Sequence, residues 1–225
     1  MTNRKEKNMK EKVRGFREPV NALTHLIGMF LSVAAAFMMY LKIVMTDSVN
    51  PLTFISVTAF SVGLICLYYG SYHYHAVWAS ASRLLKLKKL DHAMIFLLIA
   101  GSYTPFCLLG LTGFARTALL SAIWITASAG ILMMVFWIDM PRWLNTFLYI
   151  FLGWFAIFAI VPLYYNLPAP AFALLLVGGI FYTIGGVIYG LKKPNGKILG
   201  FHEIFHIFVL LGSAAHVAAV LGYLI

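Results

Sequence analysis

Two histidines four residues apart are the first sign of chemistry in this sequence. His202 and His206 stand at the start of the last long apolar segment. Positions four apart on a helix lie one above the other, about 6 Å along the axis, so both imidazoles face one spot. Two neutral imidazoles at this spacing form half of a zinc site. Ionisable side chains are costly in a membrane helix, which favours metal ligation over hydrogen bonding at a helix end.

Composition places the chain in a membrane. Hydrophobic residues make up 62% of its 225 residues, charged residues make up 11%, and the mean hydropathy is +0.88. A soluble domain has about 25% charged residues. The net charge of +10 is concentrated in the N-terminal tail and in certain loops, as in proteins that orient themselves in a bilayer. We therefore expect contact with membrane lipids and no nucleic-acid partner.

Seven apolar segments follow the basic tail. Each is close to the ~20 residues that cross a bilayer. The sequence therefore predicts an all-α membrane protein, with a disordered cytoplasmic tail over residues 1–17 and a seven-helix transmembrane bundle over residues 18–225. Pro105 and Pro162 are expected to kink the third and fifth spans. The predicted spans are residues 22–43, 52–75, 91–110, 117–137, 143–164, 169–190 and 201–224.

Lysine and arginine positions predict the orientation. The tail and the connections on its side of the membrane hold nearly all of the basic residues, and Lys42 and Arg116 lie on the other side. By the positive-inside rule the N-terminus is cytoplasmic, and seven spans place the C-terminus outside. The expected location is the cell membrane. Cys66 and Cys107 both lie within apolar segments, so neither a disulfide framework nor a cysteine-based zinc site is expected.

This topology brings polar groups from several helices to one membrane depth. Ser71 and His75 end the second span, and Asp91 opens the third, on the same side as the start of the seventh. Helix bundles build metal sites from facing side chains of this kind. His75 is therefore the expected third ligand. Three histidines leave the fourth zinc position for water, as in a catalytic site.

Asp91 and Ser71 each have two interpretations. Asp91 would accept a hydrogen bond from the zinc-bound water or from a ligating imidazole, and it is equally suited to cap its own helix. Ser71 would donate a hydrogen bond to a developing oxyanion. Its alternative role is a bond back to the carbonyl groups of its own helix.

The remaining histidines are weaker candidates. His73 faces another side of its helix than His75 does. His25 ends a polar stripe that begins at Glu18, for which helix capping is favoured over a place in the cavity. His216 lies ten residues beyond the seventh-span pair, roughly 15 Å deeper. It is too distant for the same metal, and we expect an interior hydrogen bond.

With these residues in order on seven spans, the chain resembles the hemolysin III proteins, which are related to the progestin and adiponectin receptors and more distantly to the alkaline ceramidases. The resemblance covers nearly the whole chain after the tail. It rests on the seventh-span histidine pair together with three segments: Asn21-Ala-Leu-Thr-His25, Ser71-Tyr-His-Tyr-His75 and Ser102-Tyr-Thr-Pro-Phe106.

The resemblance implies Zn²⁺ held by His75, His202 and His206, with Asp91 and Ser71 nearby. It also implies hydrolysis of a lipid amide or ester. The main hypothesis is therefore a zinc-dependent hydrolase that acts on a lipid-like substrate from the cytoplasmic leaflet. In it Asp91 takes the proton of a water molecule, and Ser71 helps to hold the oxyanion.

Three alternatives remain. One is a non-enzymatic receptor or sensor with a structural zinc. Another is a hemolysin-like cytolysin, although seven strongly apolar spans are typical of a resident membrane protein. The third is an intramembrane metalloprotease, because His202–His206 is a His-Glu-x-x-His sequence in which Glu203 would be the general base. That motif is short and lacks a second acidic ligand motif, so Asp91 is the preferred base.

Overall fold

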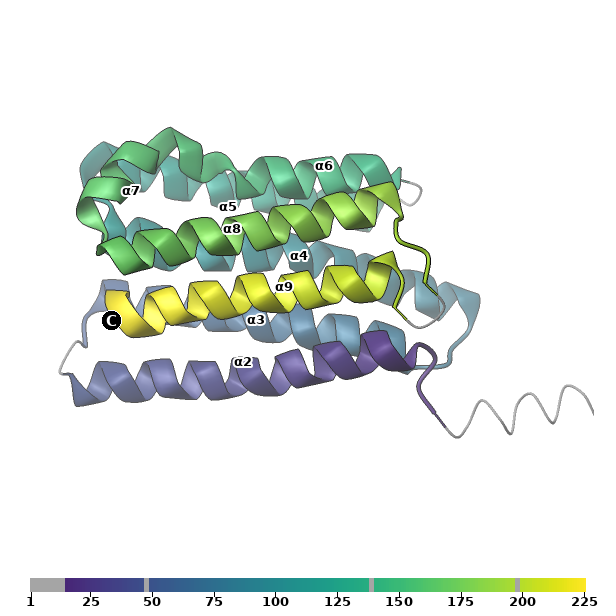
Figure 1. Cartoon of the computed structure of the whole chain (residues 1–225). Helices are drawn as coiled ribbons and strands as arrows, with labels where there is room; N and C mark the ends of the chain where they lie inside the picture. Colours follow the sequence, from purple (N-terminus) through teal and green to yellow (C-terminus); the bar gives the residue numbers. More distant parts are fainter. Residues whose placement is uncertain (1–14, 47–48, 138–139, 197–198) are drawn as a thin grey trace, which may run out of the picture.

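The chain folds into helices that lie side by side along one direction (Figure 1). The computed structural model describes residues 15–46, 49–137, 140–196 and 199–225, so all but residues 15–17 of the predicted tail lies outside the described residues. Among the described helices, seven are long and apolar enough to cross a membrane, and α6, η1 and α7 together form the fifth. The elements are α2 (Pro19–Met45), α3 (Pro51–Ala76), α4 (Ala81–Gly110), α5 (Gly113–Phe136), α6 (Arg142–Gly153), η1 (Phe155–Ala159), α7 (Ile160–Asn166), α8 (Ala169–Leu191), α9 (Phe201–Ala219) and η2 (Val220–Leu224).

The third span begins earlier than the sequence predicts. Helix α4 starts at Ala81 and not near residue 91, and the side chain of Ser80 caps it by accepting the backbone N–H of Arg83 at 3.4 Å. Lysines and an arginine in the added turns had obscured this extension, because charged residues end an apolar run without ending a helix. Asp91 therefore lies inside α4, and its interpretation as a helix cap is wrong.

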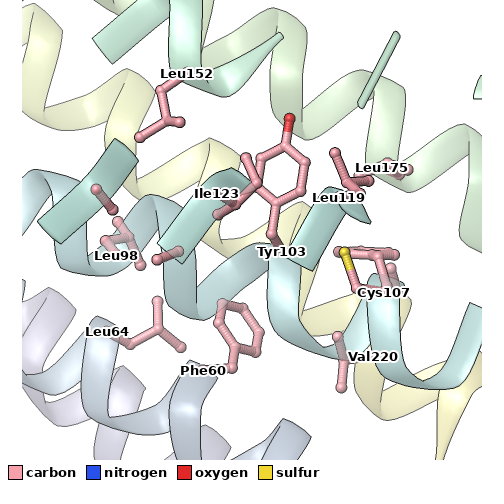
Figure 2. Packing of buried hydrophobic residues seen from close by; sticks show 14 of the residues in the cluster. Phe60, Leu64, Leu98, Tyr103, Cys107, Leu119, Ile123, Leu152, Leu175 and Val220 are labelled. Carbon is pink, nitrogen blue, oxygen red and sulfur yellow. The ribbon is translucent and has the colours of Figure 1, made fainter. Parts of the chain in front are cut away.

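Helix α4 lies at the centre of the bundle. In its most apolar stretch 72% of the residues are buried, against 50% or less in the other spans. It packs between α3 and α5. A Cβ atom at Gly101 would lie 2.6 Å from the carbonyl oxygen of Ala59, so glycine permits the close contact between α3 and α4. Figure 2 shows Phe60 and Leu64 of α3 packed toward α4 at this contact.

The fifth span is interrupted near its middle. Helix α6 ends at Gly153, and a short 3₁₀ turn joins it to α7. The sequence predicts a kink at Pro162, whereas the interruption precedes that residue. The Tyr103 hydroxyl donates to the carbonyl of Gly153 at 2.5 Å and accepts the N–H of Ala156 at 2.8 Å. Backbone groups freed within a membrane need such partners inside the protein.

Helices α2, α3 and α9 bring the predicted site together. Helix α2 packs against both α3 and α9. Just before α2, the backbone N–H groups of Arg17 and Glu18 donate to the carbonyls of Ala76 and His75 at 3.2 and 3.0 Å. The start of α2, the end of α3 and the start of α9 therefore meet at one end of the molecule, which Figure 1 shows on the right. We call this the α9-start end.

Candidate metal centre

Three imidazole rings from two helices meet at the α9-start end. His75 lies in the last turn of α3, and His202 and His206 lie in the first two turns of α9. The ring centroids of His75 lie 4.9 and 5.0 Å from those of His202 and His206, which are 4.8 Å apart, and the ring planes cross at 79°, 73° and 89°. Each ring offers one nitrogen within 4.8 Å of the other two. The three predicted ligands thus form one cluster, which we call the histidine triad.

The start of α9 is fixed by Glu203. One carboxylate oxygen accepts the backbone N–H of Gly200 at 3.0 Å, which satisfies a backbone donor at the N-terminus of α9. The other accepts the side-chain N–H of Asn21 from α2 at 2.9 Å. These bonds orient the first turns of α9, and with them both of its triad histidines. Because both oxygens of Glu203 are engaged, the structure argues against its role as the general base of a protease.

The outer nitrogens of two triad rings have partners on α2 or directly before it. Nδ1 of His75 donates to a carboxylate oxygen of Glu18 at 2.5 Å. Nδ1 of His206 lies 3.3 Å from the hydroxyl oxygen of Thr24, and that hydroxyl donates to a carbonyl of its own helix, Val20 at 2.9 Å or Asn21 at 3.0 Å. The hydrogen of the His206–Thr24 bond therefore belongs to the imidazole. In both rings the proton on Nδ1 leaves the lone pair on Nε2 free to bind a metal.

Glu18 is the acidic residue that supports a triad ring, a role that the sequence analysis had offered to Asp91. Glu18 also pairs with Arg17 at 3.0 Å and accepts the side-chain N–H of Asn21 at 3.3 Å. Burial raises the pKa of Glu18, but the hydrogen bond from His75 and the neighbouring charge of Arg17 outweigh it and hold the pKa below its usual value. Glu18 is thus an anion at neutral pH. The sequence contained one indication of this role for Glu18: it begins the polar stripe that ends at His25, at the membrane depth of the triad.

The triad fits a metal ion by its unpaired atoms and by its donor set. His75 is completely buried, and its Nε2 has no hydrogen-bond partner among the described residues. A buried nitrogen without a partner requires an explanation, and a cation between the three rings would supply one. Three neutral imidazoles with a position left open match the ligands of catalytic zinc sites. The three histidines could therefore hold a metal ion.

A fourth imidazole covers the triad. His25 of α2 stacks on His206 with centroids 3.6 Å apart and planes at 11°, and its edge meets Tyr68 at 5.1 Å. Both ring nitrogens of His25 are buried without partners among the described residues. Capping is therefore the wrong interpretation of His25. The polar stripe on α2 pointed to this place, but sequence spacing alone does not distinguish a cavity wall from a helix end.

A cavity of about 310 Å³ runs from the triad into the bundle between α4, α6, α8 and α9. Its walls are largely apolar, and the polar residues that line it include Ser71, Asp91, His202, His206 and, farther along α9, His216. Nε2 of His216 donates to the carbonyl of Leu175 at 3.2 Å, so the predicted interior hydrogen bond is confirmed.

Ser71 and Asp91 line the same cavity as His202 and His206, but no hydrogen bond joins either of them to the triad among the described residues. Ser71 is buried and forms no hydrogen bond with another described residue, so its alternative role, a bond back to its own helix, is not seen. The carboxylate of Asp91 lies 3.7 Å from Nδ1 of the neighbouring His92. Both side chains therefore remain available to a molecule in the cavity.

Most of the chain matches known proteins in sequence. A family model described as "Haemolysin-III related" matches residues 14–217. The chain is 38% identical over 206 residues to the "Hemolysin-3 homolog" of Bacillus subtilis (strain 168), over 92% of this chain and 93% of that protein. It is 37% identical over 209 residues to "Hemolysin-3" of Bacillus cereus, over 92% of each. The human "Monocyte to macrophage differentiation factor" is 27% identical over 169 residues, over 73% of this chain and 68% of that protein.

Proposed function

This chain belongs to the haemolysin-III-related family, and we propose that it is a zinc-dependent hydrolase of lipid amide or ester bonds. The observation that carries the proposal is the histidine triad at the end of an apolar cavity that also contains Asp91 and Ser71. His75, His202 and His206 would hold the ion. We further propose that the α9-start end faces the cytoplasm, because the basic tail and most basic loops lie on that side.

The residues around the triad have separate tasks. Zinc, when bound, supplies Lewis-acid chemistry: it polarises a carbonyl and makes water more acidic. Glu18 and Thr24 hold the Nδ1 protons of His75 and His206, so that both rings present Nε2 to the ion. The carboxylate of Asp91 would accept a proton from water and return it to the leaving amine or alcohol. The hydroxyl of Ser71 would donate to the carbonyl oxygen as its negative charge grows.

The shape and lining of the cavity favour a lipid substrate. A volume of about 310 Å³ is within the range of small-molecule sites. Beyond the triad the wall consists mainly of leucine, isoleucine, phenylalanine and other apolar residues, for example Leu98, Ile99 and Val209. An acyl chain buried there would remove apolar surface from water. It would also exclude bulk water from the reacting carbonyl.

Removal and return of zinc test the proposal directly. The detergent-purified protein should hydrolyse an acyl amide or acyl ester probe. A chelator should abolish turnover, and added zinc should restore it, because three ligands without the ion cannot polarise the carbonyl. Product release would be followed by chromatography. Protein that contains zinc but is inert on both amide and ester probes would contradict the hydrolase proposal and favour the receptor alternative.

The Glu18–His75 bond should determine how tightly zinc binds. We expect Glu18→Gln to lower zinc affinity about 10- to 100-fold, because carboxylate partners of ligating histidines have effects of this size. Competition with a chelator of known affinity measures the change. His73→Ala is the control, because His73 lies on the same helix as His75 but stacks on Tyr69 and is not part of the triad. Equal zinc affinity in Glu18→Gln and wild type would show that this bond does not support the metal.

A further inference from the structure

The first turn of α6 carries three polar side chains on one helix face, each with a buried polar atom that has no partner. Arg142, Asn145 and Thr146 are spaced three and four residues apart, so they lie on the same side of the helix. Nη1 of Arg142, Oδ1 of Asn145 and Oγ1 of Thr146 are buried without hydrogen-bond partners among the described residues. Asn145 and Thr146 are only 6% and 7% exposed. Such a concentration of unpaired polar atoms indicates a missing ligand.

This turn borders the cavity next to the histidine triad. Thr146 and Tyr189 line the cavity wall. The guanidinium carbon of Arg142 lies 4.8 Å from the ring centroid of Tyr189 and 5.3 Å from that of Phe201. The Tyr189 ring is in turn 5.4 Å from the ring of His202. Two aromatic rings thus hold the guanidinium of Arg142 in place. The ring of Tyr189 lies between this guanidinium and His202 of the triad.

The charges at this turn favour an anion. Arg142 forms no salt bridge with a carboxylate in the part of the chain that the structure describes. Its guanidinium is permanently charged and presents several donors in a fixed fork that matches phosphate and carboxylate oxygens. The N-terminus of α6 has no side-chain cap among the described residues, and a helix N-terminus carries a partial positive charge.

We propose that the first turn of α6 binds an oxyanion, a phosphate or carboxylate group carried by a lipid or free in solution. Arg142 forms the fork on the anion, and Thr146 donates its hydroxyl hydrogen. A 180° rotation of the Asn145 side-chain amide exchanges the positions of its oxygen and its NH₂ group, so that the NH₂ group donates to the anion. The site is at the α9-start end of the cavity, so a lipid bound there has its head group at Arg142 and its chain along the apolar wall. Anionic lipids are therefore the expected substrate class. The identity of the bond that is cleaved is the one part that rests on the proposed function.

Equilibrium binding to the detergent-purified full-length protein tests the site without any turnover. The probes are dioctanoyl phosphatidic acid and, as its uncharged match, dioctanoylglycerol. We expect Arg142→Gln to bind the phosphatidic acid about tenfold more weakly or worse, because a charge-assisted fork is lost. Arg142→Lys should lose less, since it keeps the charge, and Thr146→Val should bind several-fold more weakly. Dioctanoylglycerol should bind all variants and wild type equally.

Two controls separate this site from general attraction to basic residues and from misfolding. Arg83→Gln removes an exposed arginine at the same end of the molecule and should leave the affinity unchanged. The zinc content of each variant reports on the integrity of the bundle, and Thr146→Val is nearly isosteric. Undiminished binding of phosphatidic acid by both Arg142→Gln and Thr146→Val would overturn the proposal. So would an equal loss in Arg83→Gln, or an equal loss for both probes.

Inorganic phosphate distinguishes the two sources of the anion. If phosphate displaces phosphatidic acid from wild type at concentrations close to those of the lipid, and less well from Arg142→Gln, the turn is a site for a free anion. If phosphate displaces it only at far higher concentrations, the lipid head group is the ligand. Absence of turnover on every amide and ester probe would contradict the proposed hydrolase but would leave this binding result unaffected.

Discussion

Replacing His206 by alanine should remove the bound zinc almost completely, whereas purified wild-type protein should contain zinc in stoichiometric amounts. His206 supplies one of only three imidazoles in the triad. Two remaining histidines leave half of a tetrahedral site empty. The side chain is 1% exposed, so its removal leaves a buried vacancy beside the other two imidazoles. Mass spectrometry of the metal content of detergent-purified protein measures the loss, which should be equally large for His75→Ala.

His73→Ala is the matched control for these variants. His73 lies on the same helix as His75, two residues away, and stacks on Tyr69 at 6.0 Å instead of joining the triad. Its replacement should leave the zinc content unchanged. Zinc at wild-type levels in His206→Ala, or its absence from wild type prepared with excess zinc, would refute the metal centre.

Replacing Asp91 by asparagine should keep the zinc and abolish most of the turnover. Asp91 lines the cavity but is not one of the triad ligands, so the ion does not depend on it. Asparagine has nearly the same shape but cannot accept a proton. Loss of a general base lowers rates by about 10²- to 10⁴-fold. Turnover and zinc content should be measured on the same preparation, so that a loss of metal is not mistaken for a loss of proton transfer.

Glu203→Gln distinguishes this mechanism from that of a His-Glu-x-x-His protease. Both oxygens of Glu203 are bonded at the start of α9, and the amide oxygen of glutamine can still accept the backbone N–H of Gly200. Turnover should therefore survive in Glu203→Gln and fail in Asp91→Asn. The reverse pattern would make Glu203 the base, and full activity of Asp91→Asn would remove that residue from the mechanism.

The helices and the metal ligands could be predicted because their causes are local. An apolar run of about twenty residues must form a membrane helix, since its backbone groups have no other partners in lipid. The spacing of His202 and His206 places them on one helix face whatever surrounds the helix. Charged residues end an apolar run but not a helix, so the first turns of α4 were missed and Asp91 was open to a second interpretation.

The supporting contacts could not be predicted, because they join distant parts of the chain. Glu18 and His75 are 57 residues apart, and Asn21 and Glu203 are 182 residues apart. Nothing in either local sequence specifies that α2 packs against both α3 and α9. The place of His25 on the triad has the same origin, because the side chain that it stacks on belongs to another helix.

The sequence by itself determined that this protein is a bundle of seven membrane-spanning helices with histidines at one depth. Hydrophobic length and helical periodicity depend only on neighbouring residues. The tertiary structure alone decided which carboxylate holds His75, which aromatic rings hold Arg142, and where the fifth span breaks against Tyr103. These are matters of packing between helices, and a bilayer leaves many helix arrangements open until close contacts and interhelical hydrogen bonds select one.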